Sequence, residues 1–178
     1  MQRFSALRGP KNVAPGTAGS ILLLIVIALL ILRPWEDGAE EGPAVATAFV
    51  TRVVDGDTVE ARIGDEVEDV RYIGVDTPET VKPGEPVQCF GPQASAFNHH
   101  LVESRQVRLV FGAERRDTYG RLLAYVYLGR RFINADLVRR GLARSLTIPP
   151  NDRYAPLFRR LELRAARAGR GLWGSCQP

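Results

Sequence analysis

Three short apolar runs separated by tight-turn residues constrain the fold of this chain most. The runs cover residues 49–54, 58–63 and 70–75, and Asp55-Gly56-Asp57 and Gly64-Asp65 stand between them. Runs of about six residues bounded by Asp and Gly are typical of strands joined by turns. We therefore expect a meander of three strands.

Two further strands and three helices are predicted after the meander. Residues 107–111 and 122–128 form apolar runs of strand length. Apolar residues with helical spacing recur in residues 92–103, 133–141 and 157–169. Five strands with helices between and after them predict an α+β fold, a small β-barrel with helices.

The charge balance differs between the two ends of the chain. The first 47 residues carry four basic and four acidic side chains, so the whole net charge of +4 belongs to residues 48–178. A basic domain is compatible with a polyanionic partner but does not require one. The length of 178 residues fits a single domain plus a short extra segment.

The extra segment is an uncharged stretch from Val13 to Leu32. Its length suits the roughly 20 residues of a membrane-spanning helix, and it has no polar face that would suit a core helix. We expect a basic cytoplasmic N-terminus (residues 1–12), a transmembrane anchor (13–33), an acidic linker (34–46) and a domain (47–178).

The charges around this stretch predict where the domain lies. Basic residues before it and acidic residues after it put the N-terminus inside and the domain on the extracytoplasmic side of the cell membrane. A cleaved signal peptide, which would release a secreted domain, is the alternative. We favour the anchor because the small-residue cleavage candidates near residues 44–48 lie some twelve residues past Leu32.

The chain has two cysteines, Cys89 and Cys176. An exported domain would use them for one disulfide, whereas in a reducing compartment they would be two unrelated thiols. We therefore expect the disulfide.

Carboxylates near two of the turns can hold a metal ion. Calcium takes several oxygen ligands from carboxylates, backbone carbonyls and water. Asp57, Asp76 and the carbonyl of Thr77 supply such a set and leave room for water and a phosphate oxygen. Glu79, beside Pro78, lies where a general base can be aimed at water. Asp-Gly-Asp-Thr can also be no more than a turn, and that interpretation stays open.

Two arginines can bind a phosphate next to these carboxylates. Arg71 lies inside an apolar strand, and Arg121 opens the next strand after Tyr119-Gly120. A guanidinium group binds phosphate oxygens in a bidentate way. Strict strand alternation puts Arg71 and Asp76 on opposite faces, so a twist, a bulge at Gly74 or an early strand end must bring them together.

Five blocks of sequence carry a resemblance to a known family. They are D-G-D-T (55–58), R-Y-I-G-V-D-T-P-E-T (71–80), F-G-P-Q-A-S-A-F (90–97), D-T-Y-G-R-L-L-A-Y-V-Y (117–127) and N-A-D-L-V-R-R-G-L-A (134–143). In this order they resemble the thermonuclease, or staphylococcal nuclease, family over residues 48–174. The resemblance implies an OB-type five-stranded barrel with three helices that cleaves DNA and RNA with Ca²⁺.

The resemblance also implies roles for single residues. Asp57 and Asp76 resemble the metal carboxylates and Thr77 the carbonyl ligand. Glu79 resembles the residue that activates or positions the attacking water, and Arg71 and Arg121 those that stabilise the transition state. Tyr119 resembles a tyrosine that contacts the substrate phosphate. The family releases the 5′ oxygen and leaves 3′-phosphate products.

Two differences from the family pattern concern substrate binding. Lys82 is the only base in residues 81–90, where the founding enzyme has a lysine-rich loop, and residues 145–150 contain no aromatic ring for base stacking. The alternative function is a catalytically silent OB module that binds single-stranded nucleic acid. Silent relatives should have lost a metal carboxylate, Glu79 or an arginine, and this chain has lost none. We expect a monomer with no protein partner.

Eight arginines are spread over the last two helical segments. A run of charge is usually a solvated face, and we favour that interpretation over a nucleic-acid track. The residues are Arg139, Arg140, Arg144, Arg159, Arg160, Arg164, Arg167 and Arg170.

Overall fold

The computed structural model describes residues 44–81, 84 and 86–176. The predicted N-terminal tail and anchor, and the linker up to residue 43, lie outside these residues. In the part of the chain that the structure describes, no helix is long and apolar enough to cross a membrane.

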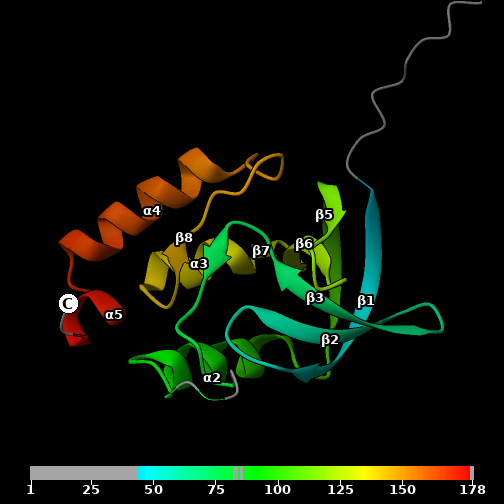
Figure 1. Cartoon of the computed structure of the whole chain (residues 1–178), viewed down its shortest axis with the longest axis horizontal. Coiled ribbons are helices and arrows are strands. Elements are labelled where there is room, and N and C mark those ends of the chain that lie inside the picture. The colour runs from blue at the N-terminus through cyan, green and yellow to red at the C-terminus, as the bar shows by residue number, and fades with distance from the viewer. Residues whose placement is uncertain (1–43, 82–83, 85, 177–178) are drawn as a thin grey trace, which may run out of the picture. The chain divides into compact units, whose positions relative to one another are not determined.

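Five strands close into a mixed barrel (Figure 1). The first three form the predicted meander, in which β2 pairs antiparallel with both β1 and β3. β5 pairs with β1 and with β6, and a parallel pairing of β3 with β6 closes the barrel. The strands are β1 (Val45–Val53), β2 (Thr58–Ile63), β3 (Glu66–Tyr72), β5 (Gln106–Arg116) and β6 (Leu122–Leu128).

Alternating apolar residues of these strands fill the barrel. Val50, Val59, Val70, Leu109 and Val126 are fully buried, one from each strand. Closure of the barrel pairs the strand edges that an open sheet would leave exposed. The OB-type five-stranded barrel expected from the sequence is confirmed.

Three helices and three very short strands surround the barrel. The helices are α2 (Gly91–Val102), α3 (Ile133–Arg140) and α4 (Ala155–Arg167), as predicted, and a single turn, α5 (Leu172–Ser175), follows. α3 packs against both β6 and α4 (Figure 1). The two-residue strands are β4 (Val75–Asp76), β7 (Arg131–Phe132) and β8 (Arg144–Ser145).

The third strand ends earlier than the apolar run predicts. We expected a strand through Val75, but β3 stops at Tyr72 and the chain turns at Ile73-Gly74, where Gly74 has φ 79°. A Cβ atom at Gly74 would overlap the Phe158 ring of α4, so glycine lets the turn lie against that helix. Beyond the turn, β4 pairs with β8 instead of continuing β3.

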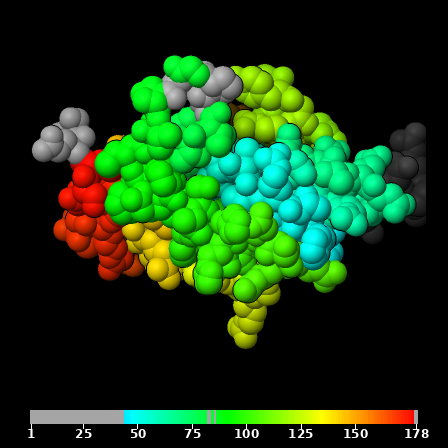
Figure 2. Space-filling view, turned by 90° about the horizontal axis from the view of Figure 1, so that it is seen from below, coloured from blue at the N-terminus to red at the C-terminus, as the bar shows by residue number. Residues whose placement is uncertain are grey.

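The predicted disulfide between Cys89 and Cys176 is present, with the two Cα atoms 5.8 Å apart and a sequence separation of 87. It joins the loop before α2 to the end of α5. In Figure 2 the red C-terminal segment lies beside the green segment that contains α2.

Candidate active site

The Asp55-Gly56-Asp57 turn fixes one carboxylate of the site. The amide of Asp57 donates to Asp55 Oδ1 at 3.0 Å, and the carbonyl of Asp57 accepts from the Tyr72 amide at 2.9 Å. A Cβ at Gly56 would come within 2.7 Å of the Thr77 side chain. The glycine therefore lets Thr77 approach the turn. This close contact explains why position 56 of the turn is a glycine.

Asp57 is held by a buried ion pair. Its Oδ2 lies 2.8 Å from Arg71 Nη1 and accepts a hydrogen bond of 2.7 Å from the Thr77 amide. The side chains of Asp57 and Arg71 are only 4% and 15% exposed. Two of the predicted metal ligands are thus adjacent, and an arginine neutralises the carboxylate in the described structure.

Two opposing effects act on the acidity of Asp57. Burial raises the pKa of its carboxyl group to about 7, while Arg71 and the Thr77 amide favour the ionised form. Burial is the larger effect because the group has lost nearly all contact with water. A cation bound at Asp57 would favour the ionised form further.

Asp76 shares the same guanidinium group. Its Oδ1 lies 3.1 Å from Arg71 Nη2, and its side chain is 56% exposed. The turn at Gly74 is what brings Arg71 and Asp76 to one side, so the early end of β3 resolves the conflict with strict alternation. Arg71 also donates to the carbonyl of Val75 at 2.9 Å, which holds the chain next to Asp76.

The oxygens of this group suit a hard cation. Asp57 Oδ1 accepts only a long hydrogen bond, of 3.3 Å, from the Thr58 hydroxyl, and no described residue donates to Asp76 Oδ2. Each carboxylate therefore keeps an oxygen free for a metal, as the oxygen-rich coordination of Ca²⁺ requires. Among the residues described, no cluster of three His, Cys, Asp or Glu side chains forms a metal site. Backbone carbonyl, water and phosphate oxygens would have to complete the shell.

The second predicted arginine lies in the same pocket as the first. Arg71 and Arg121 both line a hollow of about 300 Å³. Asp117 holds Arg121 through its Oδ2, which lies 2.8 Å from both Nε and Nη2. Nη1 of Arg121 has no described hydrogen-bond partner, which leaves one edge of the guanidinium for a ligand.

The loop after β8 supplies an apolar wall to this pocket. Leu146 and Ile148 line it together with the arginines and are themselves 37% and 59% exposed. The sequence indicated only that aromatic rings were missing from this segment. The structure adds that two aliphatic side chains face the pocket, as alternate residues of an extended loop do.

Glu79 is held by its own loop. Its Oε1 accepts hydrogen bonds from the amides of Thr80 at 2.9 Å and Val81 at 3.0 Å. Gln88 binds the backbone of Glu79 twice, accepting from its amide at 3.0 Å and donating to its carbonyl at 2.9 Å. Glu79 does not line the arginine pocket.

Tyr119 is also outside the arginine pocket. Its side chain is 84% exposed, and it lines a neighbouring hollow with Arg121 and residues of β3. The ring lies 5.4 Å from the guanidinium carbon of Arg121. The structure therefore groups Asp57, Arg71, Asp76 and Thr77, and the pocket joins Arg121 to this group through Arg71. Glu79 and Tyr119 do not line that pocket.

The sequence analysis missed four residues of this region: Gln88, Asp117, Leu146 and Ile148. Asp117 carried a usable signal, because an acid four residues before Arg121 across a Tyr-Gly turn can pair with it. The other three have no motif of their own and depend on how the loops fold.

Comparison with known proteins identifies the family. Residues 69–175 match the family described as "Staphylococcal nuclease homologue", which is more than half of the chain. The chain belongs to the staphylococcal nuclease family.

Several members of the staphylococcal nuclease family are similar along most of the chain. A thermonuclease from Staphylococcus intermedius is 40% identical over 165 residues, covering 88% of this chain and 96% of the relative. A thermonuclease from Staphylococcus hyicus is 36% identical over 162 residues, covering 86% and 96%. Endonuclease YncB from Bacillus subtilis (strain 168) is 42% identical over 124 residues, covering 68% and 59%.

Membership of the staphylococcal nuclease family confirms two predictions from the sequence. The family resemblance itself is confirmed, and so is the prediction of a hydrolytic, metal-dependent nuclease at the level of the family. The roles of the individual site residues remain predictions.

Proposed function

We propose that this chain is a calcium-dependent endonuclease that hydrolyses DNA, RNA or both outside the cytoplasm and leaves 3′-phosphate ends. One observation carries the proposal: a single guanidinium, that of the partly buried Arg71, contacts both Asp57 and Asp76 and shares its pocket with Arg121. Carboxylates for a hard cation thus adjoin two cationic groups for a phosphate.

Asp57, Asp76 and the Thr77 carbonyl would hold the calcium ion. A bound divalent cation supplies positive charge that stabilises the phosphoryl oxygens as the phosphodiester is attacked. The free oxygens on the two carboxylates support this assignment. Water and the substrate phosphate would fill the rest of the shell.

The protein side chains would do the remaining chemistry. Glu79 takes a proton from the attacking water, whose oxygen bonds to phosphorus while the bond from phosphorus to the 5′ oxygen breaks. The departing 5′ oxygen takes up a proton from solvent water and leaves as a hydroxyl group. Arg71 and the open edge of Arg121 bind the phosphate oxygens, where charge is greatest in the transition state. Glu79 would have to turn from its loop amides toward the pocket, or act through a chain of water.

The proposed site of action follows from residues 1–46. The segment 13–33, uncharged from Val13 to Leu32, would anchor the protein, with the nuclease domain on the extracytoplasmic side. The Cys89–Cys176 disulfide supports this location, because such bonds persist in oxidising environments. Protease added to intact cells whose envelope permits access should digest the domain and spare the anchor. A mature protein beginning near Thr47 and released to the medium would instead support secretion.

The activity is tested by incubating the purified full chain with end-labelled DNA and RNA, first with calcium and then with excess chelator. We expect cleavage that requires calcium, and fragments whose 3′ ends become substrates for a ligase or polymerase only after phosphatase treatment. Cleavage without divalent metal would contradict the site assignment. Tight binding without any cleavage would favour the alternative, a silent single-strand-binding module.

A further inference from the structure

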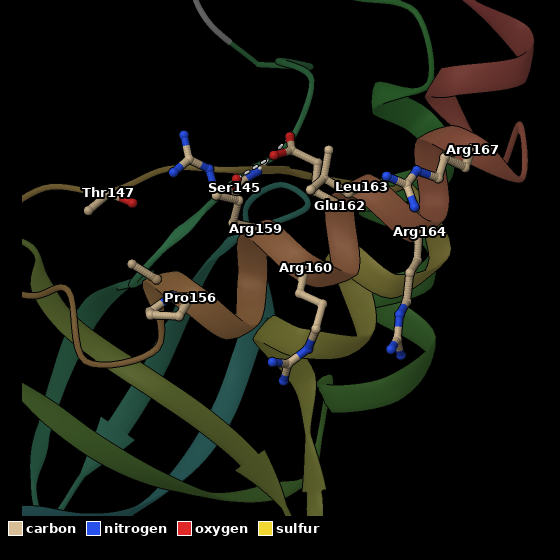
Figure 3. A pocket seen from close by; sticks show the side chains of 10 residues that line it. Ser145, Thr147, Pro156, Arg159, Arg160, Glu162, Leu163, Arg164 and Arg167 are labelled. Carbon is tan, nitrogen blue, oxygen red and sulfur yellow. Dashed lines mark hydrogen bonds between the residues drawn. The ribbon is translucent and has the colours of Figure 1, made fainter.

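A hollow lined by arginines runs along α4, separate from the arginine pocket. It has a volume of about 1020 Å³, and Arg159, Arg160, Arg164 and Arg167 contribute to its lining. Figure 3 shows Arg160 and Arg164 extending to the same side of the helix. We call this feature the α4 groove.

The sequence of α4 separates a buried face from this charged one. Phe158, Leu161 and Ala165 are buried and hold the helix against the domain. Arg160, Arg164 and Arg167 follow at spacings of four and three residues, which places them along one stripe. At a rise of 1.5 Å per residue the stripe is about 10 Å long.

The charges of the α4 groove are not used inside the described structure. None of its four arginines forms an ion pair with a described carboxylate. Glu162, the acidic residue of the groove, is already engaged: it accepts from the Ser145 amide at 3.1 Å and from the Ser145 hydroxyl at 2.5 Å (Figure 3). The groove therefore presents a strong net positive charge to solvent.

One loop forms the boundary between the α4 groove and the candidate active site. Ser145 and Thr147 line the groove, whereas Leu146 and Ile148 line the pocket that contains Arg71 and Arg121. Alternate side chains of the same four-residue segment thus face two adjacent hollows. A polymer bound in the pocket needs to cross only this segment to reach the α4 arginines.

We propose that the α4 groove binds the phosphate backbone of the substrate strand beyond the nucleotides held in the active site. A strand whose phosphates are at least about 3.4 Å apart along its axis places up to about three of them along the 10 Å stripe. Leu163, 51% exposed among the arginines, offers an apolar contact for a sugar or base. The proposal rests on the proposed nuclease function, because that function supplies the strand.

Two features favour a nucleic-acid strand over an anionic lipid surface as the partner. The charges line a hollow rather than a projecting face, and only the segment 145–148 separates this hollow from a pocket suited to a phosphodiester. Arginine also binds phosphate oxygens in a bidentate way, which suits a chain of separate phosphates. The proposal therefore departs from the solvated face that the sequence alone favoured.

The experiment compares two triple variants of the full chain that carry the same charge change. One is Arg160→Ala/Arg164→Ala/Arg167→Ala, in the groove. The control is Arg62→Ala/Arg105→Ala/Arg130→Ala, three exposed arginines on other elements without a described ion-pair partner. All six positions are on the surface, so neither variant should disturb folding, and circular dichroism checks this.

Binding of labelled single-stranded DNA of 4 and 16 nucleotides is measured by fluorescence anisotropy in chelator, over a range of salt concentrations. We expect the groove variant to bind the 16-mer at least about tenfold more weakly, and the salt slope to fall by about 2, since each lost phosphate contact removes about 0.7. The 4-mer should bind within about twofold of wild type. The control variant should resemble wild type on both strands, because its arginines line neither the α4 groove nor the arginine pocket.

Three results would overturn the inference. If the groove variant binds the 16-mer as tightly as wild type does, the α4 arginines are only a solvated surface. If both variants lose the same affinity, the loss comes from the change in net charge and not from the groove. Loss of binding to phosphatidylserine vesicles with unchanged DNA binding would assign the groove to a membrane surface. Cleavage of the 4-mer with calcium is followed in parallel: failure of the wild type to cleave it would refute the proposed function, whatever the groove does.

Discussion

Arg71 connects most of the groups that define the candidate active site. Its guanidinium contacts Asp57 and Asp76 and donates to the carbonyls of Tyr72 and Val75, although its side chain is only 15% exposed. A buried charge needs several such partners to offset the loss of water. The same contacts fix the two carboxylates relative to each other before any ligand binds.

Replacing Glu79 with glutamine should separate catalysis from binding. Gln keeps the shape and can still accept hydrogen bonds from the Thr80 and Val81 amides, but it cannot take a proton. We expect kcat on a short oligonucleotide to fall by about 10² to 10⁴ at saturating calcium, with KM nearly unchanged. Steady-state kinetics measures this, and a near-normal kcat would remove Glu79 from the mechanism.

Arg121→Lys keeps the positive charge but loses the planar fork. Asp117 holds one edge of the Arg121 guanidinium, and the other edge is open. A lysine ammonium has no second edge, so it could not pair with Asp117 and bind a phosphate in a bidentate way at the same time. We expect a loss in kcat larger than the loss in substrate affinity, if the fork engages the phosphate chiefly in the transition state. Arg130→Lys, at an exposed turn, is the matched control and should leave both constants unchanged.

Asp57 gives the metal-free protein an unusual pH dependence. Its folded-state pKa is raised by burial to about 7, so between about pH 4 and 7 the folded protein keeps a proton that the unfolded chain releases. Stability supplied by this group is therefore lost as the pH rises through that window. Relative to Asp57→Asn, wild type in chelator should lose unfolding free energy from pH 4 to 7.

Urea denaturation of both proteins across that range measures the effect. Calcium should reverse the trend in wild type at pH 7 and leave Asp57→Asn unaffected, since the amide cannot replace a charged ligand. A difference between the two proteins that stays constant with pH would mean that Arg71 keeps Asp57 ionised throughout.

Motif spacing revealed the charged residues of the site but not the side chains that hold them. Asp57, Arg71, Asp76 and Arg121 stand in short turn-flanked blocks whose residue types already indicate phosphate chemistry. Gln88 and Ile148 act through contacts that form only when two distant loops fold, and nothing in their local sequence marks them. Residues with a chemical signature were predictable, and residues with only a positional role were not.

The turn between β3 and β4 decides which way the carboxylates face. Two-residue strands such as β4 and β8 are too short to show any periodicity. The sequence therefore predicted a single strand over residues 70–75, where the structure has the end of β3, a turn and the start of β4. The five barrel strands and three helices were predictable because each is long enough to repeat its pattern.

Gly74→Ala should be much more destabilising than Gly64→Ala. Both glycines have positive φ, 79° and 61°, so both substitutions carry the strain of a left-handed residue, about 1 to 2 kcal/mol. Gly64 has open space around its Cβ position, whereas Gly74 faces the Phe158 ring, which is buried. Overpacking should add about 1 to 3 kcal/mol at Gly74 alone.

Chemical denaturation of the two variants gives the comparison. Gly74→Ala should also lower activity at temperatures where it remains folded, because the turn positions Asp76 relative to Arg71. Equal losses of stability in the two variants would show that α4 yields easily to the added methyl group.

The disulfide is the one covalent link between distant parts of the domain. Closing a loop with a sequence separation of 87 should contribute about 4 to 5 kcal/mol to the unfolding free energy in the chain-entropy model. We expect the double variant Cys89→Ser/Cys176→Ser to lose that amount in urea denaturation. Wild type treated with a reductant should unfold at nearly the same urea concentration as the double variant.

Thiol labelling of the denatured, unreduced protein provides an independent check. Protein taken from the compartment in which it accumulates in its own cells should show no free thiol. Two reactive thiols per chain would contradict the bond, and with it one of the reasons for placing the domain outside the cytoplasm.

The position of the Cys89–Cys176 disulfide bears on how a cell can produce a nuclease without damage to its own nucleic acids. Cys89 directly follows Gln88, which holds the backbone of Glu79, so the bond secures both the C-terminal end and the loop that carries the proposed base. Before oxidation, a newly made chain would be less stable and its Glu79 loop less firmly held. The genomic DNA and messenger RNA of the producing cell would then meet only a less stable enzyme. The stable enzyme would form only in an oxidising compartment that contains neither nucleic acid.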